Sequence, residues 1–141
     1  MTYLLDTNVI SEFTKPEPAT AVIQWLQSQQ HHPLHLSVIT IGEIQQGIAR
    51  LPASAKKADL QTWLDDTLLP SYGQHILPLD TDTMLIWGQL TAVLLSQGRR
   101  LPVMDGLLAA TARQHDLILV TRNTADFADT GVALVNPWLP V

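Results

Sequence analysis

Acidic and amide side chains stand at five places in this sequence where they can do metal chemistry. Asp6 follows the first apolar run in YLLDTN, Glu43 lies in ITIGEI, Asp105 lies in PVMDGLL, and Asn123 and Asp126 lie in LVTRNTADF. Carboxylate oxygens are the preferred ligands of hard divalent cations such as Mg²⁺ and Mn²⁺. A cation held by such groups lowers the pKa of a bound water and stabilises charge on a phosphate. These residue types therefore favour metal-dependent hydrolysis of a phosphate ester.

The elements that must position these side chains alternate between short apolar runs and longer helical patterns. Such alternation is typical of βα units around a mostly parallel sheet. The expected strands span residues 3–5, 34–36, 76–77, 117–120 and 133–135, and the expected helices span residues 19–30, 41–51, 53–69, 83–97 and 103–115. The predicted fold class is α/β with four to five short strands, and residues 1–141 are expected to form a single domain.

A parallel sheet brings the acidic residues to one edge. Asp6, Glu43 and Asn123 come after expected strands, whose C-terminal ends converge at the edge where open α/β folds bind ligands. Asp105 precedes its strand, but it lies in the first turns of a helix that runs antiparallel to the sheet and begins at this edge. Like charges that meet in a partly buried place are costly unless a cation neutralises them. The predicted cluster therefore implies Mg²⁺ or Mn²⁺.

Each acid also has a purely structural explanation. Asp6 is suited to cap a helix N-terminus, and Thr40 and Glu43 have the Thr-x-x-Glu spacing of a capping box. Asp105 can complement a helix dipole, and Asp126 can close an Asx turn. The shared edge is what favours the metal interpretation over four independent structural roles.

Composition narrows the function classes. The 141 residues carry a formal net charge of −5 and no Cys. This charge argues against broad non-specific binding to a duplex, and the lack of Cys excludes disulfides and thiolate metal sites. A hydrophobic fraction of 46% with 15% charged residues is typical of a compact globular protein. Neither a membrane span nor a signal peptide is expected, so the protein is expected to be cytoplasmic.

Five motifs, taken together and in order, resemble those of one family. LLDTNVISE, ITIGEIQQGI, PVMDGLLAATA, LVTRNTADF and the closing NPW span nearly the whole chain, and the sequence resembles the PIN-domain ribonucleases of the VapC toxin family, closest to the FitB type. The resemblance implies a Rossmann-like α/β/α sandwich and Mg²⁺-dependent endonucleolytic cleavage of RNA. It also implies a homodimer held inactive by a cognate antitoxin of the VapB or FitA kind, with which it forms a higher assembly. The helical faces at residues 22–26 and 63–69 are the expected antitoxin contacts.

The resemblance also assigns roles to single residues. Asp6, Glu43 and Asp105 match the three acidic metal-site positions of the family, and Glu43 is our candidate to orient or deprotonate the attacking water. The fourth position is Asp in some relatives and Asn123 here, which brings no charge. Asp126 lies three residues further on, so either residue can complete the site.

Neighbouring polar residues are candidates for supporting roles. Thr7, Asn8 and Thr121 can orient Asp6 or the loop after the fourth expected strand, although a capping role explains each equally well. Arg122 lies beside the expected site and can meet an RNA phosphate or, equally, a surface acid.

Two other function classes compete with the nuclease. Phosphotransfer through an aspartyl nucleophile needs a second Asp two residues after Asp6, where this chain has Asn8. A receiver-like or catalytically inactive Mg²⁺-binding module is the non-enzymatic alternative, but a receiver needs a Lys where this chain has Asn136. The cluster HHPLH at residues 31–35 has no transition-metal spacing, and a loop after a helix is the favoured explanation for it.

Overall fold

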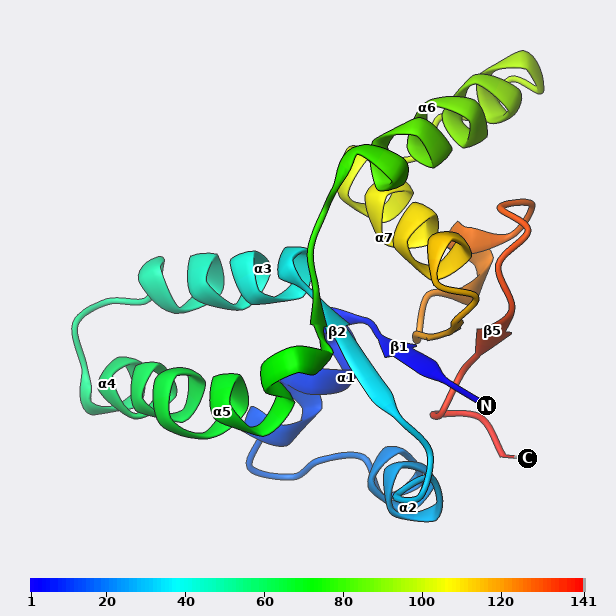
Figure 1. The fold of residues 1–141 in the computed structure, drawn as a ribbon. Coiled ribbons are helices and arrows are strands. Elements are labelled where there is room, and N and C mark those ends of the chain that lie inside the picture. The colour runs from blue at the N-terminus through cyan, green and yellow to red at the C-terminus, as the bar shows by residue number, and fades with distance from the viewer. Residues whose placement is uncertain (141) are drawn as a thin grey trace.

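The centre of the protein is one five-stranded sheet in which every strand runs parallel to its neighbours (Figure 1). The computed structural model describes residues 1–140. The strand order is β3-β2-β1-β4-β5, so the central strand is β1 and the connections wind outward in both directions. The strands are β1 (Tyr3–Leu5), β2 (Leu34–Ser37), β3 (Ile76–Leu77), β4 (Ile118–Val120) and β5 (Leu134–Val135). The predicted α/β class is confirmed, and each strand lies within one residue of its expected bounds.

Helices cover both faces of the sheet. Beyond the five expected helical regions, a short helix follows β1 directly, and α1 therefore places the residues after Asp6 at the sheet edge. The helical elements are α1 (Thr7–Ser11), η1 (Glu12–Thr14), α2 (Thr20–Ser28), α3 (Val38–Ala49), α4 (Ala55–Thr62), the π-helical η2 (Trp63–Leu68), α5 (Leu69–Tyr72), η3 (Gly73–His75), α6 (Thr81–Ser96), α7 (Val103–Gln114) and η4 (Thr124–Phe127).

The start of α3 differs from the prediction. The helix begins at Val38, three residues before the expected start, because the Ser37 side chain accepts a hydrogen bond from the Ile39 amide and caps it. Thr40 is therefore a buried residue inside the helix, and the predicted capping box between Thr40 and Glu43 does not form. Glu43 consequently lies in the second turn of α3 rather than at its cap.

Two apolar layers enclose the sheet. Alternation along β1 sends Tyr3 and Leu5 to the layer that contains Val22 of α2, and sends Leu4 to the layer that contains Leu108 of α7. Figure 1 shows α2 on one side of the strands and the pair α6 and α7 on the other. All three β1 residues are at most 5% exposed, so the strand that ends at Asp6 is held rigidly in the core.

The helices α6 and α7 pack so closely that only glycine fits at one point of contact. A Cβ at Gly106 would lie 2.9 Å from Nε1 of Trp87, a distance that a larger side chain could relieve only if the Trp87 ring or the helices shifted. Gly106 follows Asp105 directly. The close approach therefore fixes the position of the first turn of α7, and with it the Asp105 carboxylate.

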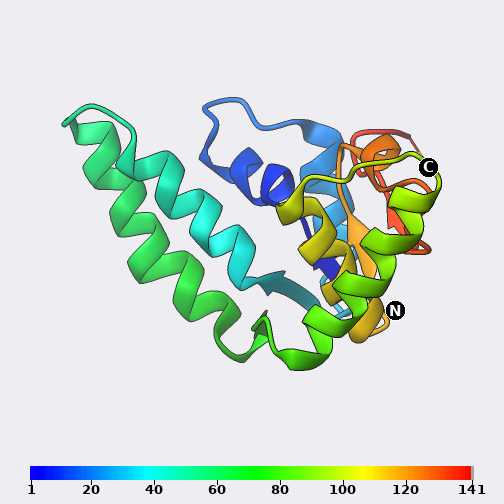
Figure 2. The ribbon, with the colours of Figure 1, turned by 90° about the horizontal axis from the view of Figure 1, so that it is seen from above.

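The helix α3 and the continuous segment α4–η2–α5 project from the sheet as a pair. Figure 2 shows the two running antiparallel and side by side away from the strands, and α3 contacts α4. Lys57 stabilises the turn between α3 and α4, because its Nζ donates hydrogen bonds to the carbonyls of Ala49 and Leu51 at 3.2 and 3.1 Å. Within residues 1–140, no helix combines the length and the apolar character needed to cross a membrane.

Candidate acidic metal centre

Asp6 stands at the end of the central strand and is held by two donors. Its Oδ1 accepts a hydrogen bond from the Thr7 amide at 2.7 Å, which caps α1, and its Oδ2 accepts one from the Thr121 hydroxyl at 2.7 Å. Each carboxylate oxygen still has a lone pair available for a cation. The capping role and the ligand role therefore do not exclude each other.

Thr121, just after β4, joins the two loops at this edge. Its fully buried side chain donates to Asp6 and accepts from the Asn123 amide at 3.1 Å and from Nδ2 of Asn8 at 3.4 Å. Asn8 also accepts a hydrogen bond from the Arg122 amide through Oδ1. Thr121 thus orients Asp6 directly, whereas Asn8 acts on the loop after β4 and does not contact the Asp6 carboxylate.

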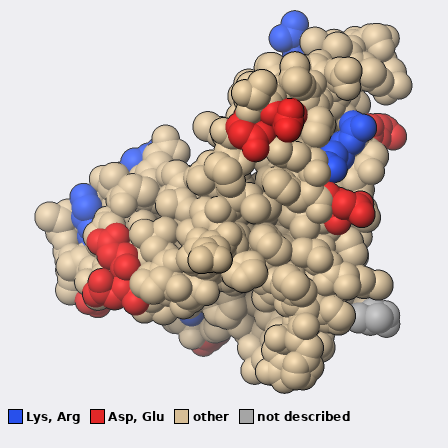
Figure 3. All heavy atoms as spheres, in the orientation of Figure 1, with Lys and Arg blue, Asp and Glu red and all other residues tan. Residues whose placement is uncertain are grey.

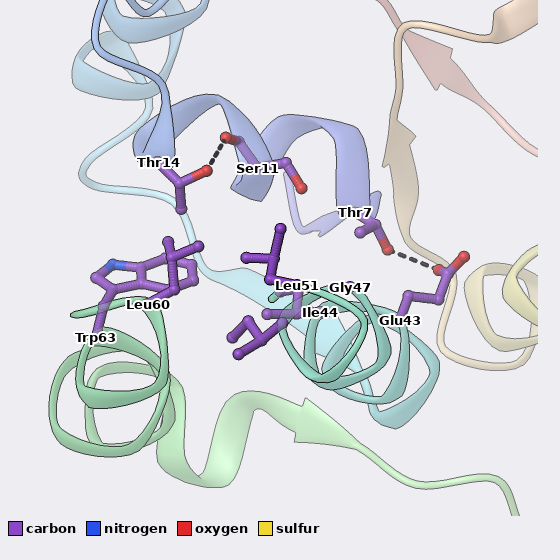
Figure 4. Close-up of a pocket in the computed structure, with 10 residues that line it drawn as sticks. Thr7, Ser11, Thr14, Glu43, Ile44, Gly47, Leu51, Leu60 and Trp63 are labelled. Atoms are coloured by element: carbon purple, nitrogen blue, oxygen red, sulfur yellow. Dashed lines mark hydrogen bonds between the residues drawn. The ribbon is translucent and has the colours of Figure 1, made fainter. Parts of the chain in front are cut away.

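Glu43 reaches the same edge from α3. The Thr7 hydroxyl donates to its Oε1 at 2.7 Å (Figure 4). The same hydroxyl lies 3.2 Å from the buried Thr40 hydroxyl. The hydrogen bond from Thr7 holds one oxygen of Glu43 and leaves Oε2 free. Thr7 therefore links two of the predicted acids, its amide binding Asp6 and its hydroxyl binding Glu43.

Burial and mutual repulsion raise the pKa of two of the acids. Desolvation is the largest cause for Asp6, opposed by the hydrogen bonds from Thr121 and Thr7 and aided by the charges of Glu43 and Asp126. For Asp105 every cause raises the pKa, first desolvation and then the charges of Asp6, Asp126 and Glu43. Both carboxylates therefore stand in an environment that disfavours their charge in the absence of a cation.

One cavity joins the predicted acids. It has a volume of about 380 Å³ and its polar lining includes Asp6, Glu43, Asp105 and Asn123. Asp126 is exposed and does not line this cavity, although its charge acts on Asp6 and Asp105. Of the two candidates to complete the site, the structure thus brings Asn123 into the cavity.

Four further residues line the cavity and were not singled out from the sequence: Ser11, Glu12, Lys15 and Trp138. Glu12 is 3% exposed; its Oε1 accepts from the Ala19 amide at 2.8 Å and its Oε2 lies 3.0 Å from Nζ of Lys15. First the Ala19 hydrogen bond and then Lys15 lower the pKa of Glu12 against the opposing effect of its burial. The position of Glu12 in the mostly apolar run VISEF was the available signal of a buried, paired acid.

The charge balance of the cavity fits a divalent cation. Within residues 1–140 the ion pairs are Lys15–Glu12 and Arg99–Asp129, so Asp6, Glu43 and Asp105 have no Lys or Arg partner there. In the same part of the chain, no three His, Asp or Glu side chains approach closely enough to hold an ion by themselves. The carboxylates of Asp6, Glu43 and Asp105 therefore suit Mg²⁺ or Mn²⁺, because these ions bind a few carboxylates and retain several waters.

The raised pKa of Asp105 predicts how stability depends on pH without metal. Because the folded state binds this proton more tightly than the unfolded chain, whose reference pKa is 3.8, stability falls as the pH rises through the raised value and then stays lower. In EDTA at pH 7, Asp105→Asn should therefore raise the free energy of unfolding, by less than about 1 kcal/mol because the side chain is only half-buried. Urea unfolding at several pH values measures this gain, which should vanish near pH 3. A variant less stable than wild type at pH 7 would contradict the repulsion.

Comparisons with known proteins give this fold and site a context. The family model described as PIN domain matches residues 3–133. The chain is 40% identical over 135 residues to the toxin FitB of Neisseria gonorrhoeae, covering 96% of this chain and 97% of FitB. It is 38% identical over 137 residues to VapC ribonuclease Y4jK of Sinorhizobium fredii, covering 97% and 98% of the two chains. The crystal structure of FitAcB from Neisseria gonorrhoeae matches with a TM-score of 0.91 at 40% identity, over 98% of this chain and 99% of that chain.

Proposed function

Because the chain belongs to the PIN domain family, we propose that it is a Mg²⁺-dependent endoribonuclease and the toxin of a toxin–antitoxin pair. The observation that carries the proposal is the set of three carboxylates without cationic partners around one cavity at the C-terminal edge of the sheet. The relatives named as a VapC ribonuclease and as the toxin FitB support it.

The position of each side chain at the cavity indicates its role in catalysis. A bound divalent ion supplies a water of lowered pKa and neutralises charge on the phosphate. Asp6 and Asp105 would hold this ion, since both carboxylates are partly buried and line the same cavity. Glu43 orients the attacking water and takes its proton at Oε2, because Thr7 occupies Oε1. Thr121 keeps Asp6 in place from the neighbouring strand.

The few Lys and Arg side chains at the cavity are the candidates to contact the RNA backbone. On the face shown in Figure 3, the described Lys and Arg side chains stand apart and form no continuous basic surface. Lys15 and Arg122 both line the cavity, but Lys15 is paired with Glu12. The Arg122 guanidinium lies 5.2 Å from the centre of the Trp138 ring, which holds it beside the acids without neutralising them. Arg122 is therefore the proposed phosphate contact.

Replacing Arg122 should weaken binding of RNA more than it slows chemistry. A charge-assisted hydrogen bond to phosphate is worth about 1.5–3 kcal/mol, so Arg122→Ala should raise KM at least about tenfold. The slope of log KM against log salt concentration should fall by about one unit. Exposed Arg100 is the matched control, because Arg100→Ala removes the same charge outside the cavity. Equal salt slopes for wild type and Arg122→Ala would remove Arg122 from the interface.

The proposed partners are an antitoxin of the FitA or VapB kind and a second copy of the chain. The similar structures FitAcB and FitAB bound to a DNA fragment support the first. An apolar groove between α1 and α3–α4, lined by Ile44, Leu60 and Trp63 and ending at Glu43, offers a place for an antitoxin segment (Figure 4). Exposed Val38 and Met104 line a second apolar groove, which suits the homodimer.

Purified protein incubated with labelled RNA tests the activity directly. Cleavage should require added Mg²⁺ and stop with EDTA, while acetyl phosphate should leave no phosphate on the protein. In cells, induction without antitoxin should arrest growth, and co-expression of the antitoxin should restore it. Absence of cleavage with soluble, folded protein across several RNAs and both metals, together with normal growth, would overturn the proposal.

A further inference from the structure

Two histidines far apart in the sequence lie side by side outside the acidic cavity. Leu36 of β2 pairs with Ile76 of β3, so the preceding residues, His35 and His75, are lateral neighbours across two parallel chain segments. Leu36 and Ile76 belong to the α2 layer. Because side chains alternate along a strand, His35 points to the opposite layer, where Leu4 and Leu77 lie. The backbone of the sheet thus fixes the separation of the two rings.

The facing nitrogens have the separation of two ligands on one metal ion. Nδ1 of His75 lies 3.3 Å from Nε2 of His35, and the rings meet edge to face with their centres 4.8 Å apart. Zinc binds imidazole nitrogen at about 2.0–2.1 Å with tetrahedral angles, which places two nitrogen ligands about 3.3–3.4 Å apart. Without an ion, one ring nitrogen can donate to the other at this distance. The same separation allows both lone pairs to bind one ion in place of the shared proton.

The protonation state of His35 also suits metal binding. Its Nδ1 is buried without a hydrogen bond of ordinary geometry, and a backbone hydrogen bond with Tyr3 is the one influence that raises its pKa. Desolvation and then the charge of His75 lower the pKa of His35, with a smaller effect from His115 on the C-terminal side of α7. A neutral imidazole is the form that binds a metal. The ion pairs within residues 1–140 leave both rings without a carboxylate partner.

From this pair we propose a second metal site, for a zinc-class ion bound by Nε2 of His35 and Nδ1 of His75. Two protein ligands leave the remaining coordination positions to water, since no third acidic or histidine side chain in residues 1–140 completes a cluster. The ligands are nitrogens, so the site selects Zn²⁺ and related transition metals over Mg²⁺. An ion here joins β2 to the turn before β3 and stabilises this side of the sheet. The site is independent of the proposed nuclease activity.

Untagged full-length protein, kept in millimolar Mg²⁺ to occupy the acidic cavity, provides the test. Isothermal titration with ZnCl₂ should show one binding event in wild type, and zinc should raise its melting temperature. His75→Gln should weaken zinc binding at least tenfold and abolish the melting shift. Exposed His31 supplies the matched control, because His31→Gln should behave as wild type. Titration calorimetry with CoCl₂ should likewise show binding in wild type and weaker binding in His75→Gln.

Two outcomes would overturn the site. One is a wild type that binds no zinc in the presence of Mg²⁺. The other is a His75→Gln variant with the same zinc affinity as wild type. His75 is exposed, so its substitution tests the ligand without removing core packing, whereas His35→Gln serves as confirmation only if the variant melts cooperatively.

Discussion

Asp6→Asn should reduce kcat/KM for RNA cleavage at least about a thousandfold, equal to about 4 kcal/mol of transition-state stabilisation. Asparagine has the same shape as aspartate, and its side-chain oxygen can still accept the hydrogen bond that the Thr7 amide gives to Oδ1. The cap of α1 is then retained, and what disappears is the negative charge beside Thr121 and the cavity. Cleavage rates under single-turnover conditions, with Mg²⁺ varied, measure the loss.

Two controls separate lost chemistry from lost structure. Asp116→Asn removes one negative charge from the exposed turn before β4, at the opposite end of that strand from Thr121, and should leave the rate unchanged. Asp116 has a positive φ of 53°, a conformation that asparagine also tolerates. Melting curves should show that Asp6→Asn remains folded, and in cells the variant should no longer arrest growth. Metal-dependent cleavage that survived both Asp6→Asn and Asp105→Asn would refute the site.

Much of the fold followed from local sequence patterns. The runs at 3–5, 34–36 and 117–120 were recognisable as strands because each is short, apolar and bounded by polar or turn residues. The convergence of Asp6, Glu43 and Asp105 on one cavity followed from the parallel order of these strands rather than from any local feature. The site prediction therefore depended on the rule that open parallel sheets bind ligands at the C-terminal ends of their strands.

Helix starts were harder to predict because competing caps lie close together. Ser37 and Thr40 are both good N-cap residues, and Val38 and Ile39 extend the apolar run of β2. Only the tertiary position of Ser37 in the sheet, where its side chain is fully buried, decides that the chain turns into α3 there. The interpretation of Thr40 and Glu43 as a capping box was wrong for this reason. Glu43 instead accepts a hydrogen bond from the Thr7 hydroxyl of α1.

Side-chain contacts between distant elements could not be predicted from the sequence. The Arg122–Trp138 contact and the pairing of His35 with His75 depend on how the C-terminal segment and β3 pack. For the histidines, adjacency in HHPLH drew attention to residues 31 and 32, whereas the partner of His35 comes forty residues later through strand register.

Glu43→Gln should lower kcat by about 10²–10⁴, the usual range for loss of a general base. Glutamine can keep its side-chain oxygen as the acceptor of the Thr7 hydroxyl, but it cannot take a proton at the position of Oε2. Mg²⁺ affinity, measured by titration calorimetry, should fall much less than in Asp6→Asn. A loss of Mg²⁺ binding as large as that of Asp6→Asn would make Glu43 a metal ligand alone and contradict its role as the base.

The hydroxyl of Thr7 supplies the control for this role, because it contacts Glu43 and Thr40 but has no hydrogen bond to Asp6, Asp105 or Asn123. Thr7→Val keeps the backbone amide that donates to Asp6 but removes the hydroxyl, so Oε1 of Glu43 loses its donor at 2.7 Å. The base then samples more orientations, and kcat should fall about tenfold to a hundredfold while KM stays nearly constant. Thr7→Ser restores the donor and should restore most of kcat. If Val and Ser at this position gave the same rate, the position of Glu43 would not depend on Thr7, because the only difference that matters between these variants is the hydroxyl that holds the carboxylate.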